Sequence, residues 1–126
     1  IGNLLNLQQL DLRNNNLTGV LPTVLTNLNN LNSLLLNGNQ LSGEIISEFS
    51  VFQELVTLDF GNNQFTGEIP ESLYDLTNLN FLSLSNNNFE GNINSDISSL
   101  SSVYFLDLSF NNFRLLFIKI NLLLIM

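Results

Sequence analysis

A period of 24 residues runs through most of this chain and constrains its fold more than any other feature. Apolar residues recur at constant spacing in four columns: Leu4, Leu28, Phe52, Leu76 and Leu100; Leu7, Leu31, Leu55, Leu79 and Val103; Leu10, Leu34, Leu58, Leu82 and Leu106; and Leu12, Leu36, Phe60, Leu84 and Leu108. A unit this short cannot bury its apolar face alone, so the period predicts coils that stack on one another.

The alternation within each unit and one column of Asn suggest how each coil is built. Alternation such as Leu10-Asp11-Leu12 is typical of a short strand with one face buried. An Asn follows each strand, and the column comprises Asn15, Asn39, Asn63, Asn87 and Asn111. We expect these Asn side chains to point inward and bond backbone groups of neighbouring coils. On this interpretation, replacing Asn15 by Leu would cost about 1 to 3 kcal/mol of stability.

These columns carry a resemblance to a known family. The segments from Leu4 to Leu25 and from Phe52 to Leu73 follow LxxLxxLxLxxNxLxGxIPxxL, with Leu, Ile or Phe at the apolar positions. Residues 1–113 thereby resemble the leucine-rich repeat family, specifically its plant-type subclass. The resemblance implies an α/β solenoid, a right-handed coil with a parallel sheet on its concave face and helical or extended segments on its convex face.

The resemblance also implies a domain organisation. About five repeats begin near residues 4, 28, 52, 76 and 100, and residues 1–3 end a preceding repeat. Neither end carries a polar capping unit of the kind that solenoids need. We therefore expect a leucine-rich repeat domain over 1–113 with uncapped ends, as in a fragment of a longer protein.

The apolar tail over 114–126 abandons the repeat, since Leu115 stands where a Gly is expected. A membrane-spanning helix needs about 20 apolar residues. The run over 115–126 is shorter, and Lys119 and Asn121 interrupt it. The sequence favours an improvised β-rich cap or an aberrant tail, and no direct membrane span.

Composition excludes several classes of function. The chain has 3 Lys and Arg against 11 Asp and Glu, a formal charge of -8, which argues against nucleic-acid binding. It contains no His and no Cys, and its nearest phosphate-loop match, Gly38 to Gly43, lacks the required Lys. Asp11, Asp59 and Asp107 share one column, but two repeats separate neighbours by about 10 Å, too far for a retaining glycosidase pair. We expect no enzyme activity, metal or cofactor; any kinase activity would lie in a domain absent from this chain.

The outward positions of the strands are the best candidates for binding a ligand. Exposed aromatic groups on a rigid sheet are typical anchors of interfaces. The candidate ligand-binding residues are Phe81, Phe105, Asp107, Asp59, Leu35 and Tyr104. An alternative is that the aromatic rings pack on each other or under an adjoining repeat.

A glycosylation motif indicates location. Asn16-Leu17-Thr18 is an N-x-[ST] acceptor directly after the inward Asn15. It is consistent with a secreted or cell-surface protein.

We therefore expect a module that binds a protein or peptide, with a co-receptor as a further possible partner. The resemblance implies part of a receptor-like kinase or receptor-like protein at the extracellular face of the plasma membrane. Two alternatives stay open: a secreted inhibitor of cell-wall-degrading enzymes, similar to polygalacturonase inhibitors, and a truncated remnant without function.

Overall fold

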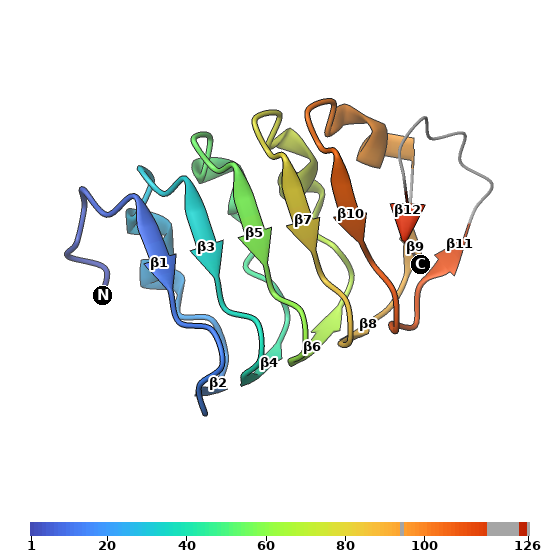
Figure 1. The fold of residues 1–126 in the computed structure, drawn as a ribbon, viewed down its shortest axis with the longest axis horizontal. Helices are drawn as coiled ribbons and strands as arrows, with labels where there is room; N and C mark the ends of the chain where they lie inside the picture. Colours follow the sequence, from blue (N-terminus) through green and yellow to red (C-terminus); the bar gives the residue numbers. More distant parts are fainter. Residues whose placement is uncertain (94, 116–123, 126) are drawn as a thin grey trace.

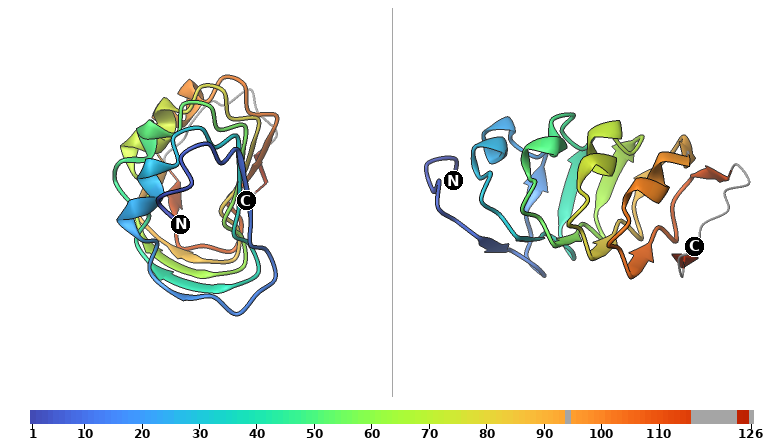
Figure 2. Two further views of the ribbon diagram at one scale, coloured as in Figure 1. Left: turned by 90° about the vertical axis from the view of Figure 1, so that its left-hand side faces the viewer. Right: turned by 90° about the horizontal axis from the view of Figure 1, so that it is seen from above.

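The computed structural model describes residues 1–93, 95–115 and 124–125. Within them the chain winds into a stack of coils, seen end-on in Figure 2, with strands on one side and short helical turns on the other. This is the solenoid that the period predicts, and the fold class is confirmed. The helical turns are 3₁₀ in type, and the part of the chain that the structure describes contains no α-helix.

The main sheet takes one strand from each coil, and all its pairs are parallel (Figure 1). Its strands, in spatial order, are β1 (Gln9–Asp11), β3 (Ser33–Leu35), β5 (Thr57–Asp59), β7 (Phe81–Ser83), β10 (Phe105–Asp107) and β12 (Leu124–Ile125). Partners in the first five strands lie 24 residues apart, for example Leu34 with Leu58. The sequence period is therefore also the register of the sheet.

A second set of strands follows where each coil leaves the main sheet. It comprises β2 (Thr18–Gly19), β4 (Gln40–Gly43), β6 (Gln64–Gly67) and β8 (Asn88–Phe89), with β9 (Asn92–Ile93) paired to β11 (Arg114–Leu115). Gly67 shows why Gly recurs here. It has a φ of +78°, and an added Cβ would lie 2.8 Å from Cγ of Glu44 in the preceding coil. A side chain at this position would be strained and would clash.

The 3₁₀ turns are η1 (Thr23–Asn27), η2 (Phe49–Val51), η3 (Glu71–Asp75) and η4 (Ser95–Ser99). Leu25, Leu28 and Leu31 are buried and three residues apart, a spacing that matches the three residues per turn of a 3₁₀ helix. Backbone bonds between residues three apart follow, such as Leu28 N–H to the Leu25 carbonyl at 3.0 Å. These turns place apolar side chains opposite those of the sheet and close the core.

The core is one continuous cluster of Leu, Ile and Phe side chains between the sheet and the 3₁₀ turns. Its centre contains five completely buried rings: Phe49, Phe52, Phe60, Phe65 and Phe89. Phe65 stacks on Phe89, and Phe89 on Phe113, with centroids 6.0 and 6.1 Å apart. The rings occupy columns held by Leu in earlier coils, and the register of the sheet does not change where they occur.

Buried Asn side chains join successive coils. Oδ1 of Asn39 accepts a hydrogen bond from Leu17 N–H at 3.1 Å, and its Nδ2 donates to the carbonyls of Leu12 and Leu36. The same pattern repeats at Asn63, Asn87 and Asn111. These amides satisfy backbone groups that leave the ladder at the end of each strand.

Asn15 departs from the predicted inward, buried column. It is exposed, and its Nδ2 donates to the Leu12 and Arg13 carbonyls of its own coil. The reason is geometric: the inward Asn bonds the backbone of the coil before it, and Asn15 lies in the first complete coil. The predicted cost of replacing Asn15 by Leu stays a prediction, and the exposure of Asn15 lowers the cost that we expect.

Most of the predicted tail over 114–126 lies outside the described residues. In the described part, β11 pairs with β9, and β12 adds to the main sheet next to β10. No helix within the described ranges has the length and apolar character needed to cross a bilayer.

Candidate ligand-binding face

The outer side of the main sheet, here called the sheet face, carries the outward side chains of β1, β3, β5, β7 and β10. Because the strands are in register, each outward position forms a straight row across coils. One row contains Thr57, Phe81 and Phe105, and the next contains Asp59, Ser83 and Asp107. Adjacent strands lie about 4.8 Å apart, so an extended ligand would meet several coils at once.

Phe81 and Phe105 form the main apolar feature of the sheet face. Their rings are stacked, with centroids 4.4 Å apart and an angle of 4° between planes. Both side chains are half-buried. The two rings therefore pack on each other, as the alternative interpretation of the sequence expects. Because they are only half-buried, the stack still presents aromatic surface to solvent.

Asp59 lies in the next row and is partly buried. Its Oδ1 accepts a hydrogen bond from Gly61 N–H at 3.0 Å. Burial raises the pKa of this carboxyl, while the hydrogen bonds from Gly61 and Ser83 act in the opposite direction. Because burial removes part of the water around this carboxylate, a cationic partner that approaches it would stabilise its charged form.

Asp107 lies two coils further along the same row. Its Oδ1 accepts hydrogen bonds from the Ser109 N–H at 3.0 Å and the Ser109 hydroxyl at 2.6 Å. Among the described residues, neither Asp107 nor Asp59 forms an ion pair. The two carboxylates therefore make this part of the sheet face negatively charged, although the charge of Arg13 acts on Asp59 from beyond ion-pair distance.

Serines at outward positions are more buried than the sequence suggests. Ser83, Ser85 and Ser109 are only 6, 6 and 8% exposed. The hydroxyls of Ser83 and Ser85 lie 3.2 Å apart. The accessible part of the face is thus narrower than a whole sheet.

Leu35 and Tyr104 complete the predicted set, and neither joins the aromatic stack. Leu35 pairs in register with Asp11 and Asp59 and is half-buried. Tyr104 directly precedes β10 and is 70% exposed. It makes no ring contact with the described residues.

The opposite end of the sheet face differs in charge. Nη2 of Arg13 lies 2.7 Å from Oδ2 of Asp11, and both side chains are about half exposed. The hydrogen bond from Arg13 lowers the pKa of the Asp11 carboxyl. This pair is internally neutral, so the first coil offers less net charge to a ligand.

Sequence reasoning missed a row of left-handed residues at the end of each strand. Asn14, Asn62, Asn86 and Phe110 have φ of 53 to 55°, and Gly38 has 72°. Asn and Gly tolerate this conformation, whereas it is an outlier for a bulky residue. Phe110 breaks the row and is 78% exposed. The repeated Asn or Gly one residue before the inward Asn was the signal that could have identified the row.

The glycosylation motif lies away from the sheet face. Asn16 is exposed and precedes β2, while the backbone of Leu17 bonds to Asn39. The side chain of Asn16 is therefore accessible from solvent, as a glycan acceptor must be.

Taken together, the sheet face combines an aromatic platform with two carboxylates on rigid strands. Such a surface can hold an apolar or aromatic side chain on the rings and a basic side chain near the carboxylates. Because the chain has no His and no Cys, its hydroxyls have no imidazole base. The geometry favours binding over chemistry.

Comparison with known proteins supports this interpretation. The Leucine Rich Repeat family model matches residues 6–28, 30–52, 54–76 and 78–100. No curated protein sequence matches the chain.

Three solved structures are similar over most of the chain. The plant peptide hormone receptor RGFR1 in complex with RGF2 has 33% identity and a TM-score of 0.87 over 90% of this chain. A TDR receptor has 41% identity and a TM-score of 0.86 over 89%. The Arabidopsis receptor kinase HAESA, in complex with the peptide hormone IDA and the co-receptor SERK1, has 32% identity and a TM-score of 0.80 over 90%. This chain spans only 18, 19 and 19% of those chains.

Proposed function

The chain belongs to the leucine-rich repeat family, and we propose that it is a ligand-recognition segment of a plant cell-surface receptor. In this proposal it binds a protein or peptide across the sheet face, and a co-receptor is a further partner. The parent protein is a receptor-like kinase or receptor-like protein that perceives the ligand outside the cell. Any kinase activity resides in another domain.

The observation that carries the proposal is the Phe81 and Phe105 stack beside the row of Asp59 and Asp107. Interfaces draw most of their affinity from a few aromatic anchors on a rigid surface. Here two parallel rings, 4.4 Å apart, span β7 and β10. The adjacent carboxylates favour a ligand with a basic residue next to an apolar one.

The similar structures support the same class of ligand. Two of the three are complexes with a peptide, RGF2 or the peptide hormone IDA, and the latter also contains a co-receptor. Since this chain corresponds to less than a fifth of each, the ligand of a whole receptor could extend over other coils. The exposed Asn16 motif agrees with an extracellular location, where N-glycans are added to the chain.

Selection of peptides from a random displayed library, using the full 126-residue chain as bait, tests the proposal. We expect binders that pair a Lys or Arg with an aromatic or apolar residue. In NMR spectra, their binding should perturb Thr57, Phe81 and Phe105 and leave Gln9 unchanged.

A scrambled version of the selected peptide is the matched control. Enrichment of acidic peptides, or perturbations confined to the 3₁₀ turns, would contradict binding on the sheet face. Failure to enrich any peptide would also count against an independent binding function of these coils.

A further inference from the structure

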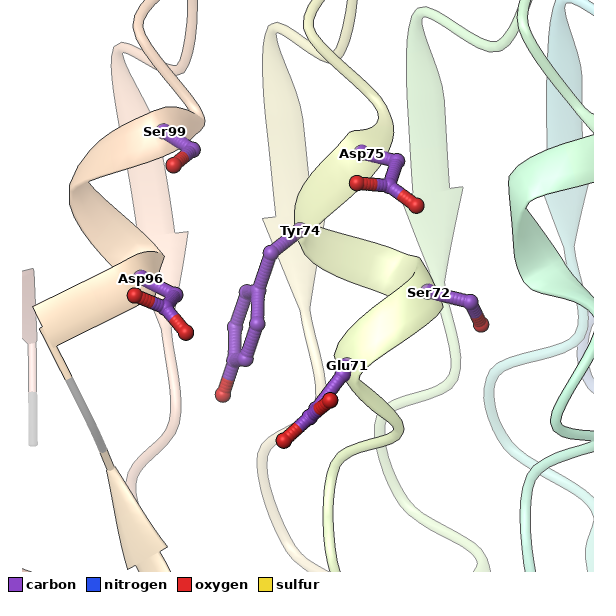
Figure 3. A pocket seen from close by; sticks show the side chains of 6 residues that line it. All are labelled: Glu71, Ser72, Tyr74, Asp75, Asp96 and Ser99. Atoms are coloured by element: carbon purple, nitrogen blue, oxygen red, sulfur yellow. The ribbon is translucent and has the colours of Figure 1, made fainter.

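A hollow lies between η3 and η4, on the side of the solenoid opposite the sheet face. Its volume is about 390 Å³, and its walls are formed by Glu71, Ser72, Tyr74, Asp75, Asp96 and Ser99 (Figure 3). All six side chains carry oxygen, and three are carboxylates. The lining contains no basic residue, so the hollow is a region of negative potential.

The second distinctive feature is Tyr74, whose hydroxyl is directed into the hollow. Figure 3 shows its ring extending from η3 with the hydroxyl between Asp96 and Glu71. The residue is only 5% exposed. Its hydroxyl forms no hydrogen bond to another described residue, and only burial and neighbouring charges act on it. The hydroxyl is not among the fully buried side-chain atoms without a partner, so it reaches the space of the hollow and is accessible to a ligand there.

Folding of the repeat does not require a Tyr here. The equivalent positions in other coils are Thr26, Ser50 and Ser98. The hydroxyls of Thr26 and Ser98 bond carbonyls within their own 3₁₀ turns, at 2.8 and 2.7 Å. Tyr74 cannot make that short bond, and its side chain instead reaches across to the next coil.

The hydroxyl stays protonated at neutral pH. Burial, together with the carboxylates of Asp96, Glu68 and Glu71, raises the pKa of Tyr74 to about 12. It therefore presents one O–H donor and an acceptor oxygen among negatively charged neighbours. A group rich in N–H donors complements this arrangement.

A metal ion is a poorer match. Among the described residues, no three Asp or Glu side chains converge as metal ligands do. A guanidinium group is larger, planar and carries five N–H donors, which suits carboxylates and a hydroxyl spread around a hollow. We propose that this hollow, the convex acidic pocket, binds the side chain of an Arg from a protein partner, through Glu71, Asp96 and the hydroxyl of Tyr74. The pocket is separate from the sheet face and independent of the function proposed for it.

The test uses Tyr74 as its own reporter. In a Tyr104→Phe chain it is the sole Tyr, so the NMR signal of 13Cζ-labelled tyrosine reports on the pocket alone. N-acetyl-arginine N-methylamide should shift this signal saturably, with a dissociation constant in the millimolar range because exposed ion pairs contribute little. The citrulline analogue, which has the same shape without the charge, should not shift it.

Substitutions locate the effect. Glu71→Gln and Asp96→Asn, on different coils, should each weaken binding about threefold or more. Glu54→Gln removes the same charge from an exposed site outside the pocket and should leave the affinity unchanged. A thermal melt of each variant establishes that it is folded.

Several results would overturn the proposal. These are an equal shift with the citrulline analogue, equal weakening by Glu54→Gln, or no saturation. Tighter binding of Ca²⁺ would indicate a metal site instead. Binding of spermidine more than about tenfold tighter than the Arg derivative would indicate a free polyamine as the ligand rather than a protein side chain.

Discussion

The side-chain oxygen of Asn63 accepts a hydrogen bond from the backbone N–H of Leu41, 22 residues earlier in the chain, at 3.0 Å. In return, Nδ2 of Asn63 donates to the carbonyls of Leu36 and Phe60. Each of those carbonyls also accepts from a second Asn, whereas the Leu41 N–H has this one side-chain acceptor. Asn63 thus joins two successive coils through its side-chain hydrogen bonds.

Replacing Asn63 by Leu should destabilise the solenoid. The substitution leaves the buried N–H of Leu41 without a partner, and the expected loss is about 1 to 3 kcal/mol in the free energy of unfolding. Urea denaturation followed by circular dichroism measures it. Asn15→Leu is the matched control: because Asn15 is exposed, water can replace its bonds, and we expect a loss below about 0.5 kcal/mol. Equal losses would contradict the role assigned to burial.

Phe110 should be a site of stored backbone strain. Its φ is +54°, in a row otherwise held by Asn and Gly. Phe110→Asn should therefore raise the free energy of unfolding by about 1 kcal/mol. Tyr104→Asn removes an aromatic ring of similar exposure at a position without positive φ, and should bring no gain. A loss of stability in Phe110→Asn would show that the ring makes contacts that outweigh the strain.

Asp59 should destabilise the fold at neutral pH. Burial raises its pKa above the ordinary value of 3.8, so the folded chain binds the proton more tightly than the unfolded chain. The stabilisation that comes from this tighter proton binding is fully present below about pH 3.8. It is lost as pH rises through the pKa of Asp59 in the folded chain. Asp59→Asn should raise Tm at pH 7 by a small amount, on the order of 2 °C. Asp11→Asn, whose carboxyl has a lowered pKa, should not raise Tm. A lower Tm for Asp59→Asn would mean that its hydrogen bonds outweigh burial.

Tyr74 should make the chain sensitive to alkali. Its pKa is raised to about 12 in the folded state from an ordinary value of 10.0. The contribution of protonated Tyr74 to the free energy of unfolding is fully present below about pH 10. It declines as pH rises towards about 12, because in that range the Tyr74 hydroxyl ionises readily only in the unfolded chain. Tyr74→Phe should remove this part of the decline in Tm, while Tyr104→Phe should leave it intact. Identical alkaline profiles in both variants would contradict the burial of Tyr74.

The sequence period predicts the fold well because one requirement repeats in every coil. Leu34 and Leu58 must face the core at the same place, and the 24-residue spacing makes them neighbours in the sheet. The inward Asn is equally readable, except at Asn15, where the pattern alone does not reveal whether a preceding coil covers the residue.

Features that depend on a single coil are harder to predict. Ser83 occupies an outward position but is buried, which the alternation along the strand does not indicate. Backbone conformation is not visible in apolar spacing, so the left-handed row that includes Phe110 was missed. The hollow beside Tyr74 arises only when η3 and η4 stack, and their side chains are 20 or more residues apart in sequence. The period therefore predicts which residues occupy outward positions on the strands, but not how buried they are or what shape the surface has.

We predict that the aromatic end of the sheet face, at Phe81 and Phe105, binds the ligand. Isothermal titration of a selected peptide against Phe105→Ala and Gln9→Ala tests this prediction most directly. Both residues lie in one row of the sheet, on β10 and β1, with β3, β5 and β7 between them. Thermal melts first establish that both variants are folded. We then predict that Phe105→Ala weakens the affinity for the peptide about tenfold or more, and that Gln9→Ala keeps it within about twofold of the original. Equal affinities, or a greater loss in Gln9→Ala, would contradict the account.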